Sequence, residues 1–445
     1  MSKNKEEQDS LMAAVMAGFK AAGIKDAEES VTTIAKYWEN MKWIDVYDPI
    51  KNRPCITLEW MLGARGFPAG KVYQLRGSFS SSKSTFLYHV YGCAMRGSTP
   101  EDRKAWIMHV ETEGAPNSAD YVAKYGCDPN MFLHVKANDL NDLFKRIDTF
   151  DMALHGGREG TVNPETGRAT KSKFTKENAL DPDMTKPSIV GVDSLSNVST
   201  DAGGDFVDLD KSEKPGGDSK DVRRFFRARE QDYDKHGLTL FVTTHETTEI
   251  KTGPGAGYGG PKATARNQKA LGMALTIGLQ TFEGDKPDWK NEATKEIYGQ
   301  KQYLSTFKSK IANKDRRIVL FRRKDGGYDF AETDLQFFLG DPRNNNCPNN
   351  PFMPGGFLCP EGAKCGITRS CGKWSAPLVS DKKFATADEL IEEIYSDKER
   401  LMKIREHLRI RGFGFPFETK YTVEDDAKAE DSDDAEEAAG EGEEE

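Results

Sequence analysis

The chain has 445 residues, which is enough for one large hydrophobic core and a smaller module. With 37% hydrophobic and 30% charged residues, its composition is that of a soluble globular protein with polar extensions. It shows neither a long apolar run nor a signal peptide, so we expect an intracellular protein without membrane contact. In that compartment its seven cysteines are thiols or metal ligands rather than disulfides.

The net charge of −9 is concentrated at the C-terminal end of the chain. Residues 424–445 carry thirteen acidic side chains and one lysine, which leaves a net charge of +3 on residues 1–423. A mildly basic body with an acidic tail suits a protein whose tail competes with a polyanion. A disordered tail that only improves solubility is the alternative.

Two helices are expected near the N-terminus. Apolar residues recur at helical spacing from Leu11 to Phe19, and a capping box at Asp26 and Glu29 begins the second helix. We assign residues 1–48 to this helical region. It either packs on the rest of the chain or serves as an oligomerisation element.

From Lys71 onward, short β-rich runs alternate with segments of helical periodicity. This alternation predicts an α/β fold with a mostly parallel central sheet flanked by helices. In such sheets, ligands bind at the carboxyl ends of the strands. Four polar or charged side chains fall at those positions: Lys83, Glu111, Asp193 and His245.

A phosphate-binding loop connects the first of these strands to a helix. Its sequence, G-S-F-S-S-S-K-S from Gly77 to Ser84, has every feature of the Walker A motif except the second glycine, which is Ser82 here. In this motif Lys83 reaches the β- and γ-phosphates, and the Ser84 hydroxyl holds Mg²⁺. A serine-rich surface turn is the alternative, but such a turn does not require a lysine at this spacing.

Two carboxylates complete the expected chemistry. Asp193 ends a buried apolar strand, as a Walker B aspartate does, where it would accept hydrogen bonds from waters on Mg²⁺; a helix cap is the alternative. Glu111 ends another strand and can orient and deprotonate a water that attacks the γ-phosphate. Glu113, two residues further on, is a competing candidate for this base.

These motifs, in this order, resemble the RecA recombinase core. The similar segments are R-G-F-P-A-G-K-V-Y-Q-L-R-G-S-F-S-S-S-K-S-T, H-V-E-T-E-G-A-P, I-V-G-V-D-S-L-S-N-V and L-T-L-F-V-T-T-H. The chain is most similar to phage recombinases of the UvsX type, over roughly residues 50–335. The resemblance implies a RecA-like fold, ATP and Mg²⁺ as cofactors, a helical filament on single-stranded DNA, and strand exchange with double-stranded DNA in recombination, repair and replication. It also implies single-strand-binding and mediator proteins as partners, in the cytoplasm of a bacterial host.

The resemblance further implies roles for individual residues. Glu111 would be the catalytic base, His245 a sensor of the γ-phosphate, and Lys308 and Lys310 would reach the nucleotide of a neighbouring subunit. Tyr121 is the nearest candidate for stacking on adenine. The implied nucleotide-binding residues are Gly77, Ser78, Phe79, Ser80, Ser81, Ser82, Lys83, Ser84, Thr85, Asp193 and Tyr121.

DNA binding is expected in the segment after His245, which matches the second DNA-binding loop of the family. Its glycines let the backbone approach DNA, its basic residues neutralise phosphates, and its tyrosine can stack on bases. A mobile surface loop is the alternative. Residues 199–217 would be the first DNA loop, although acidic residues outnumber lysines there. The implied DNA-binding residues are Tyr258, Lys262, Arg266 and Lys269.

Four cysteines lie close together in a segment with few apolar residues. Their thiolates would suit a structural tetrahedral Zn²⁺ site, but their spacing is wider than a C-x₂₋₄-C pair, so free thiols are an equal alternative. The four are Cys347, Cys359, Cys365 and Cys371.

The expected organisation is therefore a core at 49–335, a C-terminal region at 336–423 and an acidic disordered tail at 424–445. Residues 155–187 are expected to be an inserted loop. Two departures from the family pattern, Ser82 and His109 in place of an acid, would lower turnover. The alternatives are a hexameric DNA helicase with the same core, or a nucleotide-gated DNA-coating protein with weak hydrolysis.

Overall fold

The structure is a computed structural model, and nearly all of its described residues belong to one compact unit, residues 42–412. The residues that the structure describes are 41–99, 102–114, 118–156, 179–198, 217–249, 262–265, 268–282, 288–290, 294–340, 350–353, 356–359 and 365–408. The expected N-terminal helices and acidic tail lie outside these residues. Within the described residues, no helix combines the length and apolar character needed to cross a bilayer.

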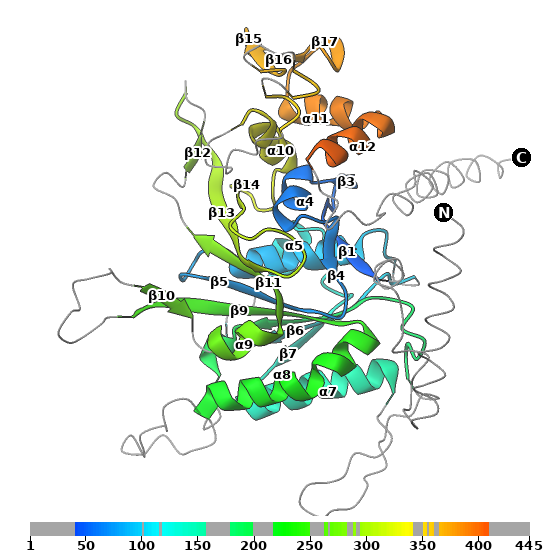
Figure 1. Cartoon of the computed structure of the whole chain (residues 1–445), viewed down its shortest axis with the longest axis vertical. Helices are drawn as coiled ribbons and strands as arrows, with labels where there is room; N and C mark the ends of the chain where they lie inside the picture. Colours follow the sequence, from blue (N-terminus) through cyan, green and yellow to red (C-terminus); the bar gives the residue numbers. More distant parts are fainter. Residues whose placement is uncertain are drawn as a thin grey trace, which may run out of the picture. The chain divides into compact units, whose positions relative to one another are not determined.

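A ten-stranded mixed sheet forms the centre of this unit (Figure 1). Six neighbouring strands are parallel, in the order β11-β5-β9-β8-β6-β7. Their bounds are β5 Val72–Gly77, β6 Trp106–Glu111, β7 Leu133–Lys136, β8 Ser188–Asp193, β9 Leu238–Glu249 and β11 Leu275–Phe282. The predicted α/β class is therefore confirmed, with the parallel strands together on one side of the sheet.

The remaining four strands are antiparallel to their neighbours. β13 pairs with β11, β12 and β14 both pair with β13, and β10 pairs with the end of β9. Their bounds are β10 Lys262–Ala265, β12 Asp288–Lys290, β13 Ile297–Ser309 and β14 Arg317–Arg323. The sheet is thus mixed.

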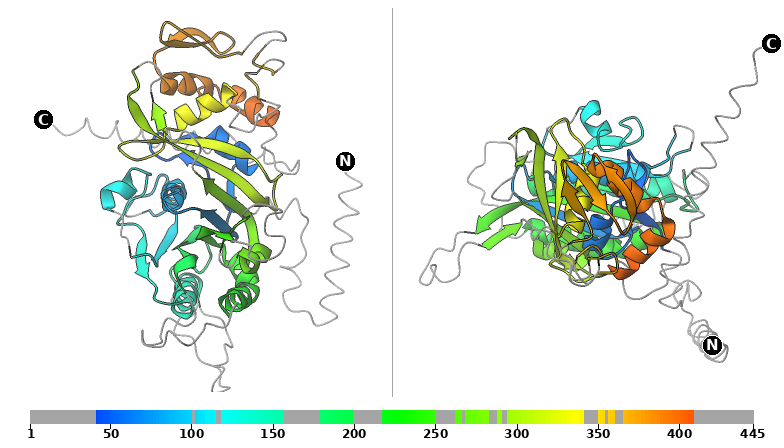
Figure 2. Two further views of the ribbon diagram at one scale, coloured as in Figure 1. Left: turned by 90° about the vertical axis from the view of Figure 1, so that its left-hand side faces the viewer. Right: turned by 90° about the horizontal axis from the view of Figure 1, so that it is seen from above.

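Helices cover both faces of the sheet (Figures 1 and 2). Helix α5 (Lys83–Met95) packs on one face, against β5, β8 and β9. On the other face lie α7 (Leu140–His155), α8 (Gly217–His236) and α9 (Gln268–Ala274). The short α6 (Ala119–Ala123) and the 3₁₀ helix η2 (Leu195–Asn197) lie in the connections between strands and helices.

Successive side chains of a strand point to opposite faces of the sheet, so one strand packs against the helices on both faces. In β8, Val190 and Val192 belong to the core cluster that includes Val222 and Phe226 of α8. The residue between the two valines, Gly191, faces α5 instead. A strand with both faces buried reads as a continuous apolar run, which is why the sequence of β8 shows no polar alternation.

The segment before the core is not helical throughout. Residues 43–48, which sequence analysis assigned to the N-terminal helical region, contain β1 (Trp43–Asp45) and β2 (Tyr47–Asp48). These strands pair with β4 (Gly66–Pro68) and β3 (Arg53–Pro54). Helix α4 (Ile56–Leu62) follows β3, is buried along its whole length, and ends at Gly63 in the left-handed conformation.

The C-terminal region adds three helices and a small sheet to the same unit. Capped helices α10 (Phe330–Phe338), α11 (Ala387–Tyr395) and α12 (Lys398–His407) begin after Asp329, Thr386 and Asp397, whose side chains each accept a backbone N–H of the first turn. The three-stranded sheet consists of β15 (Thr368–Ser370), β16 (Lys373–Ala376) and β17 (Ser380–Phe384).

Buried polar contacts join this region to α4. The Arg405 guanidinium in α12 donates two hydrogen bonds of 2.8 Å to the fully buried carboxylate of Glu59. Asp334 in α10 accepts from Thr57 Oγ1 and from Tyr395 Oη, each at 2.6 Å. Breaking a buried charge pair by removing one partner typically costs about 3–5 kcal/mol, so these contacts fix the C-terminal helices to α4.

Candidate functional site

The carboxyl ends of four parallel strands lie side by side and carry the residues that sequence analysis singled out. Gly77 at the end of β5 is opposite His245 of β9, and Glu111 at the end of β6 is opposite Asp193 of β8. Lys83, Glu111, Asp193 and His245 are all at least nine-tenths buried. The structure therefore brings these four side chains to one edge of the sheet, as predicted.

The loop from Gly77 to Ser82 connects β5 to α5 as predicted. A Cβ at Gly77 would lie 2.4 Å from both the carbonyl oxygen and the hydroxyl of Thr281, so this position has no room for a side chain. The Ser81 hydroxyl lies 2.7 Å from Thr281 Oγ1 and donates to Ser78 O at 2.8 Å. These contacts hold the loop against the end of β11.

Ser82, which replaces the second glycine of the motif, has a φ of 65° and a ψ of 31°. This is the left-handed region, where a Cβ costs roughly 1–2 kcal/mol and glycine is preferred. Arg322 Nη1 donates to Ser82 Oγ at 2.8 Å, and Gln302 Nε2 donates to Ser82 O at 3.2 Å. The backbone thus keeps the glycine-type conformation, and β13 and β14 supply two side chains that hold it.

Lys83 is the first residue of α5, and its ammonium points back into the loop. Nζ donates to Ser78 O at 2.7 Å and to Gly77 O at 3.2 Å, and it lies 3.3 Å from His245 Nδ1. Burial lowers the pKa of Lys83, although nearby carboxylates, Asp193 foremost, act in the opposite direction. A triphosphate would offer this buried ammonium stronger acceptors than two carbonyl groups.

His245 contacts three parts of the site. Its Nε2 lies 2.6 Å from Glu113 Oε1, and its backbone N–H donates to Ser196 Oγ at 2.8 Å. The ring of Phe79, which is 69% exposed, stacks on the imidazole at a centroid distance of 4.0 Å. His245 therefore connects the loop, the end of β6 and the 3₁₀ helix after β8, which suits a side chain that senses what the loop holds.

Glu111 is held in place by the backbone that follows it. Its Oε1 accepts from Gly114 N at 3.0 Å and from Glu113 N, while Oε2 lies 3.8 Å from His109 Nε2. Burial acts to raise the pKa of Glu111, but the interaction with His109 and the two backbone donors outweigh it, and the pKa is lowered. Glu111 is thus ionised at neutral pH, as a base must be.

The Mg²⁺ ligands expected from the sequence fit the site by their chemistry. Asp193 accepts a 2.6 Å hydrogen bond from Thr243 Oγ1, and its buried carboxylate lies at the end of β8. Ser84 lies in the first turn of α5, one residue after Lys83. Carboxylate and hydroxyl oxygens are the ligands that Mg²⁺ prefers. These two residues are therefore the ones that would hold it.

Tyr121, the candidate for stacking on adenine, lies beside the loop helix. Its hydroxyl is 2.8 Å from Thr85 Oγ1, and its ring makes an edge contact with Tyr125 at 5.3 Å. Tyr121 is half-buried, so part of the ring remains accessible next to α5. Its expected role stays a prediction.

Lys308 and Lys310 do not join this edge. By strand register Lys308 is opposite Gly278, which is itself opposite Gln74 near the middle of β5, and Lys310 N donates to Thr276 O. Their ammonium groups donate to Gly272 O and Met273 O at the end of α9. Within one chain the two lysines therefore lie away from the phosphate loop, toward the amino ends of the parallel strands.

The expected DNA-binding residues are only partly described. Tyr258 and Arg266 lie outside the described residues, as does nearly all of 199–217. Lys269 is exposed on α9, and Lys262 begins β10, which pairs with the end of β9 from Lys262↔Glu249 to Ala265↔Glu246. The flanks of the expected loop thus form a hairpin that extends the sheet, a feature that the glycine-rich sequence did not suggest.

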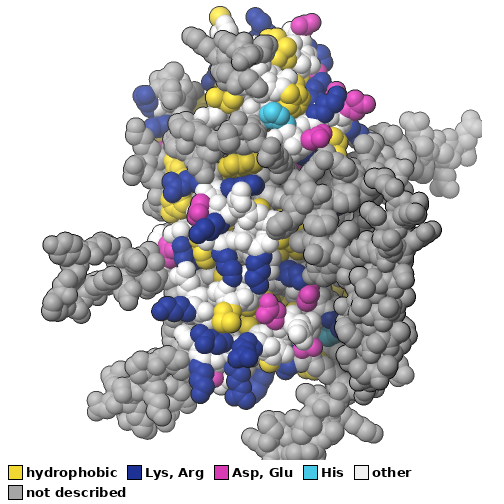
Figure 3. Space-filling view, in the orientation of Figure 1, with side chains coloured by type: hydrophobic (Ala, Val, Ile, Leu, Met, Phe, Trp, Pro, Cys, Tyr) yellow, Lys and Arg dark blue, Asp and Glu magenta, His cyan; other side chains and the backbone are white. Residues whose placement is uncertain are grey.

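Sequence analysis missed a basic surface on α8. The space-filling view shows Lys and Arg side chains gathered over the part of the molecule where α8 and α9 lie (Figures 1 and 3). Positions 220, 223, 224 and 227 share one helical face, and their spacing in the sequence was the available signal. The exposed members of this face, called here the α8 basic face, are Lys220, Arg223, Arg224 and Arg227.

The structure does not gather the described cysteines into a metal site. Cys359 is buried, Cys365 is half-buried and Cys371 is exposed. Among the described residues, groups of three or more close potential ligands contain only histidine and carboxylate side chains. The fourth cysteine of the expected Zn²⁺ site, Cys347, lies outside the described residues, so that site stays a prediction.

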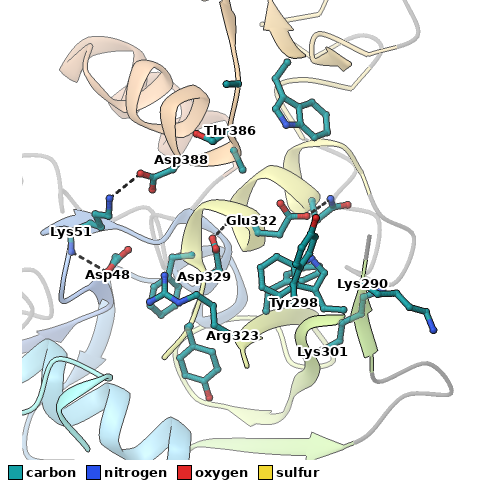
Figure 4. Close-up of a pocket in the computed structure, with 18 of the residues that line it drawn as sticks. Asp48, Lys51, Lys290, Tyr298, Lys301, Arg323, Asp329, Glu332, Thr386 and Asp388 are labelled. Atoms are coloured by element: carbon teal, nitrogen blue, oxygen red, sulfur yellow. Dashed lines mark hydrogen bonds and ion pairs between the residues drawn. The ribbon is translucent and has the colours of Figure 1, made fainter. Parts of the chain in front are cut away.

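A cleft of about 1170 Å³ lies between the β12–β14 edge, α10 and the C-terminal sheet (Figure 4). Its charged groups partly neutralise one another, since Lys51 and Arg53 bond to Asp388 at 2.9 and 2.6 Å. None of the four strand-end residues lines it. The chemistry expected of a nucleotide site therefore lies at the strand ends and not in this cleft.

Comparison of the chain with protein-family models and with curated proteins finds no match. Functional assignment consequently depends on the motifs and on the geometry of the strand ends. Those two lines of evidence agree on Lys83, Glu111, Asp193 and His245.

Proposed function

We propose that the chain is an ATP-dependent DNA recombinase of the RecA type, which forms filaments on single-stranded DNA and promotes homologous pairing and strand exchange. The observation that carries this proposal is the meeting of Lys83, Glu111, Asp193 and His245 at the carboxyl ends of adjacent strands. The strand order β11-β5-β9-β8-β6 supports it as well. The phosphate loop follows β5, so parallel strands flank it on both sides and their carboxyl ends lie beside it.

The residues of the phosphate loop and of the strand ends have separate roles in the proposed hydrolysis. The α5 N-terminus and Lys83 bind the phosphates, and Ser84 and Asp193 hold Mg²⁺, which neutralises phosphate charge when bound. Glu111 orients the attacking water and accepts its proton. His245 would sense whether the phosphate loop holds a nucleotide, because it contacts Lys83, Phe79 and Glu113 simultaneously.

Filament formation is supported by the position of two lysines that lie away from the phosphate loop of their own chain. Lys308 and Lys310 lie toward the opposite ends of the strands from the phosphate loop, so they serve a nucleotide only when a second subunit brings its loop to them. ATP then binds between subunits, and its hydrolysis is coupled to assembly. This arrangement favours a filament, and a ring helicase is the competing assembly.

The clustered positive charge on α8 favours single-stranded DNA as the partner. The α8 basic face and the β9–β10 hairpin both extend from the sheet edge that carries the phosphate loop, because α8 follows β8 and the hairpin continues β9. Clustered lysine and arginine side chains bind a phosphate backbone by releasing counterions. In this proposal, DNA and ATP bind at the same edge of the sheet.

The test uses the full chain with ATP, circular single-stranded DNA and a homologous linear duplex. We expect DNA-stimulated hydrolysis, joint molecules and helical filaments by electron microscopy. All three should be lost in Lys83→Ala and kept in Lys403→Ala, a matched change of an exposed lysine on α12. Closed six-membered rings would assign the chain to helicases, and DNA coating without hydrolysis would assign it to coating proteins; either result overturns the proposal.

A further inference from the structure

Three potential metal ligands meet at the edge of the sheet beside the proposed base. His109 and Glu111 are alternate residues of β6, so their side chains point to the same face. His134 of the edge strand β7 is directly opposite His109 in the parallel register. One ligand atom from each of the three residues lies within 4.8 Å of the others.

The imidazole of His109 presents one nitrogen to this group. The side chain is fully buried, and Nδ1 lies 3.1 Å from Tyr91 Oη. Nε2 has no hydrogen-bond partner, although it lies 3.8 Å from Glu111 Oε2. Buried polar atoms without a partner are uncommon in proteins and call for an explanation. In the tautomer whose Nδ1–H donates to Tyr91 Oη, the Nε2 lone pair is available to a metal ion bound between His109 and the Glu111 carboxylate.

This arrangement is that of a metal-ligating histidine. In metal sites, the second ring nitrogen is usually fixed by a hydrogen bond, which sets the tautomer and aims the ligating nitrogen. Glu111 is prepared in the same way, because backbone N–H groups bind Oε1 and leave Oε2 toward His109. His134 is exposed, so it provides both a movable third ligand and a path from solvent.

We propose that His109, Glu111 and His134 form a binding site for Zn²⁺ or a similar divalent transition metal. Two imidazoles and one glutamate are a ligand set that zinc enzymes use, with water in the fourth position. Bonds of about 2.0–2.1 Å place tetrahedral ligands about 3.3 Å apart, so a small rotation of the exposed His134 ring completes the site. Mg²⁺ prefers oxygen ligands and does not compete for two imidazoles.

The consequence for activity rests on the proposed function. A Glu111 carboxylate that coordinates a metal ion cannot accept a proton from the attacking water, so the bound ion inhibits hydrolysis without blocking the phosphate loop. The site thus acts as a metal-operated brake on the base. Its occupancy depends on side chains of β6 and β7 and on Tyr91 of α5, and it can be measured without ATP or DNA.

A second histidine and carboxylate group serves as a comparison. In the group formed by Asp151, His155 and His236, both Nδ1 atoms lie 3.0 Å from the carboxylate, which is hydrogen-bond length. The carboxylate therefore already satisfies both imidazoles. His155, like His109, has one ring nitrogen bound and its Nε2 buried without a partner. The difference is that the carboxylate of this group itself holds the bound nitrogens, whereas a tyrosine holds His109 and leaves Glu111 Oε2 free to act as a ligand.

The experiment titrates the purified full chain with Co²⁺ and records visible d–d absorption, then repeats the titration with His134→Gln and with the control His236→Gln. We expect His134→Gln to weaken Co²⁺ binding by at least about tenfold and Tyr91→Phe to weaken it by about 10–100-fold. The control should bind as the unmodified chain does. Thiolate charge-transfer bands separate any metal bound by the cysteines. Equal binding by His134→Gln and the unmodified chain would overturn the site.

A parallel measurement of DNA-stimulated ATP hydrolysis addresses the regulatory role. Zn²⁺ should inhibit the unmodified chain and leave His134→Gln active, with circular dichroism confirming that the variant is folded. Hydrolysis that is insensitive to Zn²⁺ in a chain that binds Co²⁺ would overturn the brake. Complete absence of hydrolysis, with or without Zn²⁺, would overturn the proposed function, whereas the absorption titration would still decide the metal site.

Discussion

The imidazole of His245 lies between the ammonium of Lys83 and the carboxylate of Glu113, with Nδ1 3.3 Å from Nζ and Nε2 2.6 Å from Oε1. Glu113 is therefore engaged by the histidine, and its side chain is partly exposed. Glu111 is buried, with one carboxylate oxygen fixed by backbone donors. This contrast favours Glu111 over Glu113 as the base of the proposed hydrolysis.

The first prediction follows from that contrast. Glu111→Gln should lower the rate of DNA-stimulated ATP hydrolysis by about 10²–10⁴-fold while ATP binding persists, because general-base catalysis contributes that much. Glu113→Gln is the matched control and should have a smaller effect, since it removes only the partner of His245. Rates measured at saturating ATP and DNA check this. A larger loss in Glu113→Gln than in Glu111→Gln would exchange the two roles.

The second prediction concerns the left-handed conformation of Ser82. Ser82→Ala removes the hydrogen bond from Arg322 and keeps the Cβ strain, whereas Ser82→Gly removes both. We therefore expect Ser82→Gly to be more stable than Ser82→Ala by about 1 kcal/mol, after the greater entropy of glycine in the unfolded chain is subtracted. Urea denaturation of the two variants measures the difference. Equal midpoints would show that the loop is unstrained.

The third prediction concerns the packing of α5 on β8. A Cβ on Gly191 would lie 1.7 Å from Tyr91 Oη, so the two residues cannot keep their positions in Gly191→Ala. Overpacking of this kind costs about 1–3 kcal/mol of unfolding free energy. Tyr91→Phe removes the clashing oxygen, and the double variant should recover part of the loss in thermal denaturation. Purely additive effects would mean that the two residues do not contact each other.

The fourth prediction concerns the α8 basic face. In Arg223→Ala/Arg224→Ala, affinity for single-stranded DNA should fall, and the slope of log affinity against log salt should decrease by about 0.7 for each lost phosphate contact. The matched control is Lys382→Ala/Lys383→Ala, two adjacent exposed lysines of β17. Fluorescence anisotropy at several salt concentrations measures both slopes. An equal decrease in the two variants would refute a specific role for α8.

The fifth prediction concerns pH and the buried His89. Burial lowers the pKa of this imidazole from 6.5 to about 3, among the rings of Phe86, Tyr328 and Phe330. As the pH falls below 6.5, His89 becomes protonated in the unfolded chain while it is still neutral in the folded chain. The folded state therefore loses up to about 1.4 kcal/mol of stability for each pH unit between 6.5 and about 3. Denaturation of the unmodified chain and of His89→Leu at several pH values should show a shallower dependence in the variant.

The strand ends could be predicted from the sequence because their signals are local. Each buried strand is a short apolar run that stops at a polar residue, as β8 does at Asp193, and parallel strands place those ends at one edge. The phosphate loop also follows from residues that are contiguous in the chain. Local pattern and parallel topology were sufficient to bring Lys83, Glu111 and His245 together.

The contacts that complete the site depend on long-range pairing and could not be read from the sequence. Arg322 reaches Ser82 from 240 residues away, through a register of β13 and β14 that no motif marks. His134 lies in β7, a largely exposed strand whose apolar alternation spans only four residues, too few to mark it in the sequence. Its position opposite His109 exists only once the sheet has formed.

The Glu59–Arg405 ion pair has a consequence for the order of events during translation. The two partners are 346 positions apart, and at ribosomal rates of about 5–20 residues per second Arg405 is made tens of seconds after Glu59. Until then the Glu59 carboxylate of α4 has no counter-charge, so α4 cannot complete its packing against α12. The four strand-end residues Lys83, Glu111, Asp193 and His245 are therefore synthesised well before the ion pair that fixes the C-terminal helices can form.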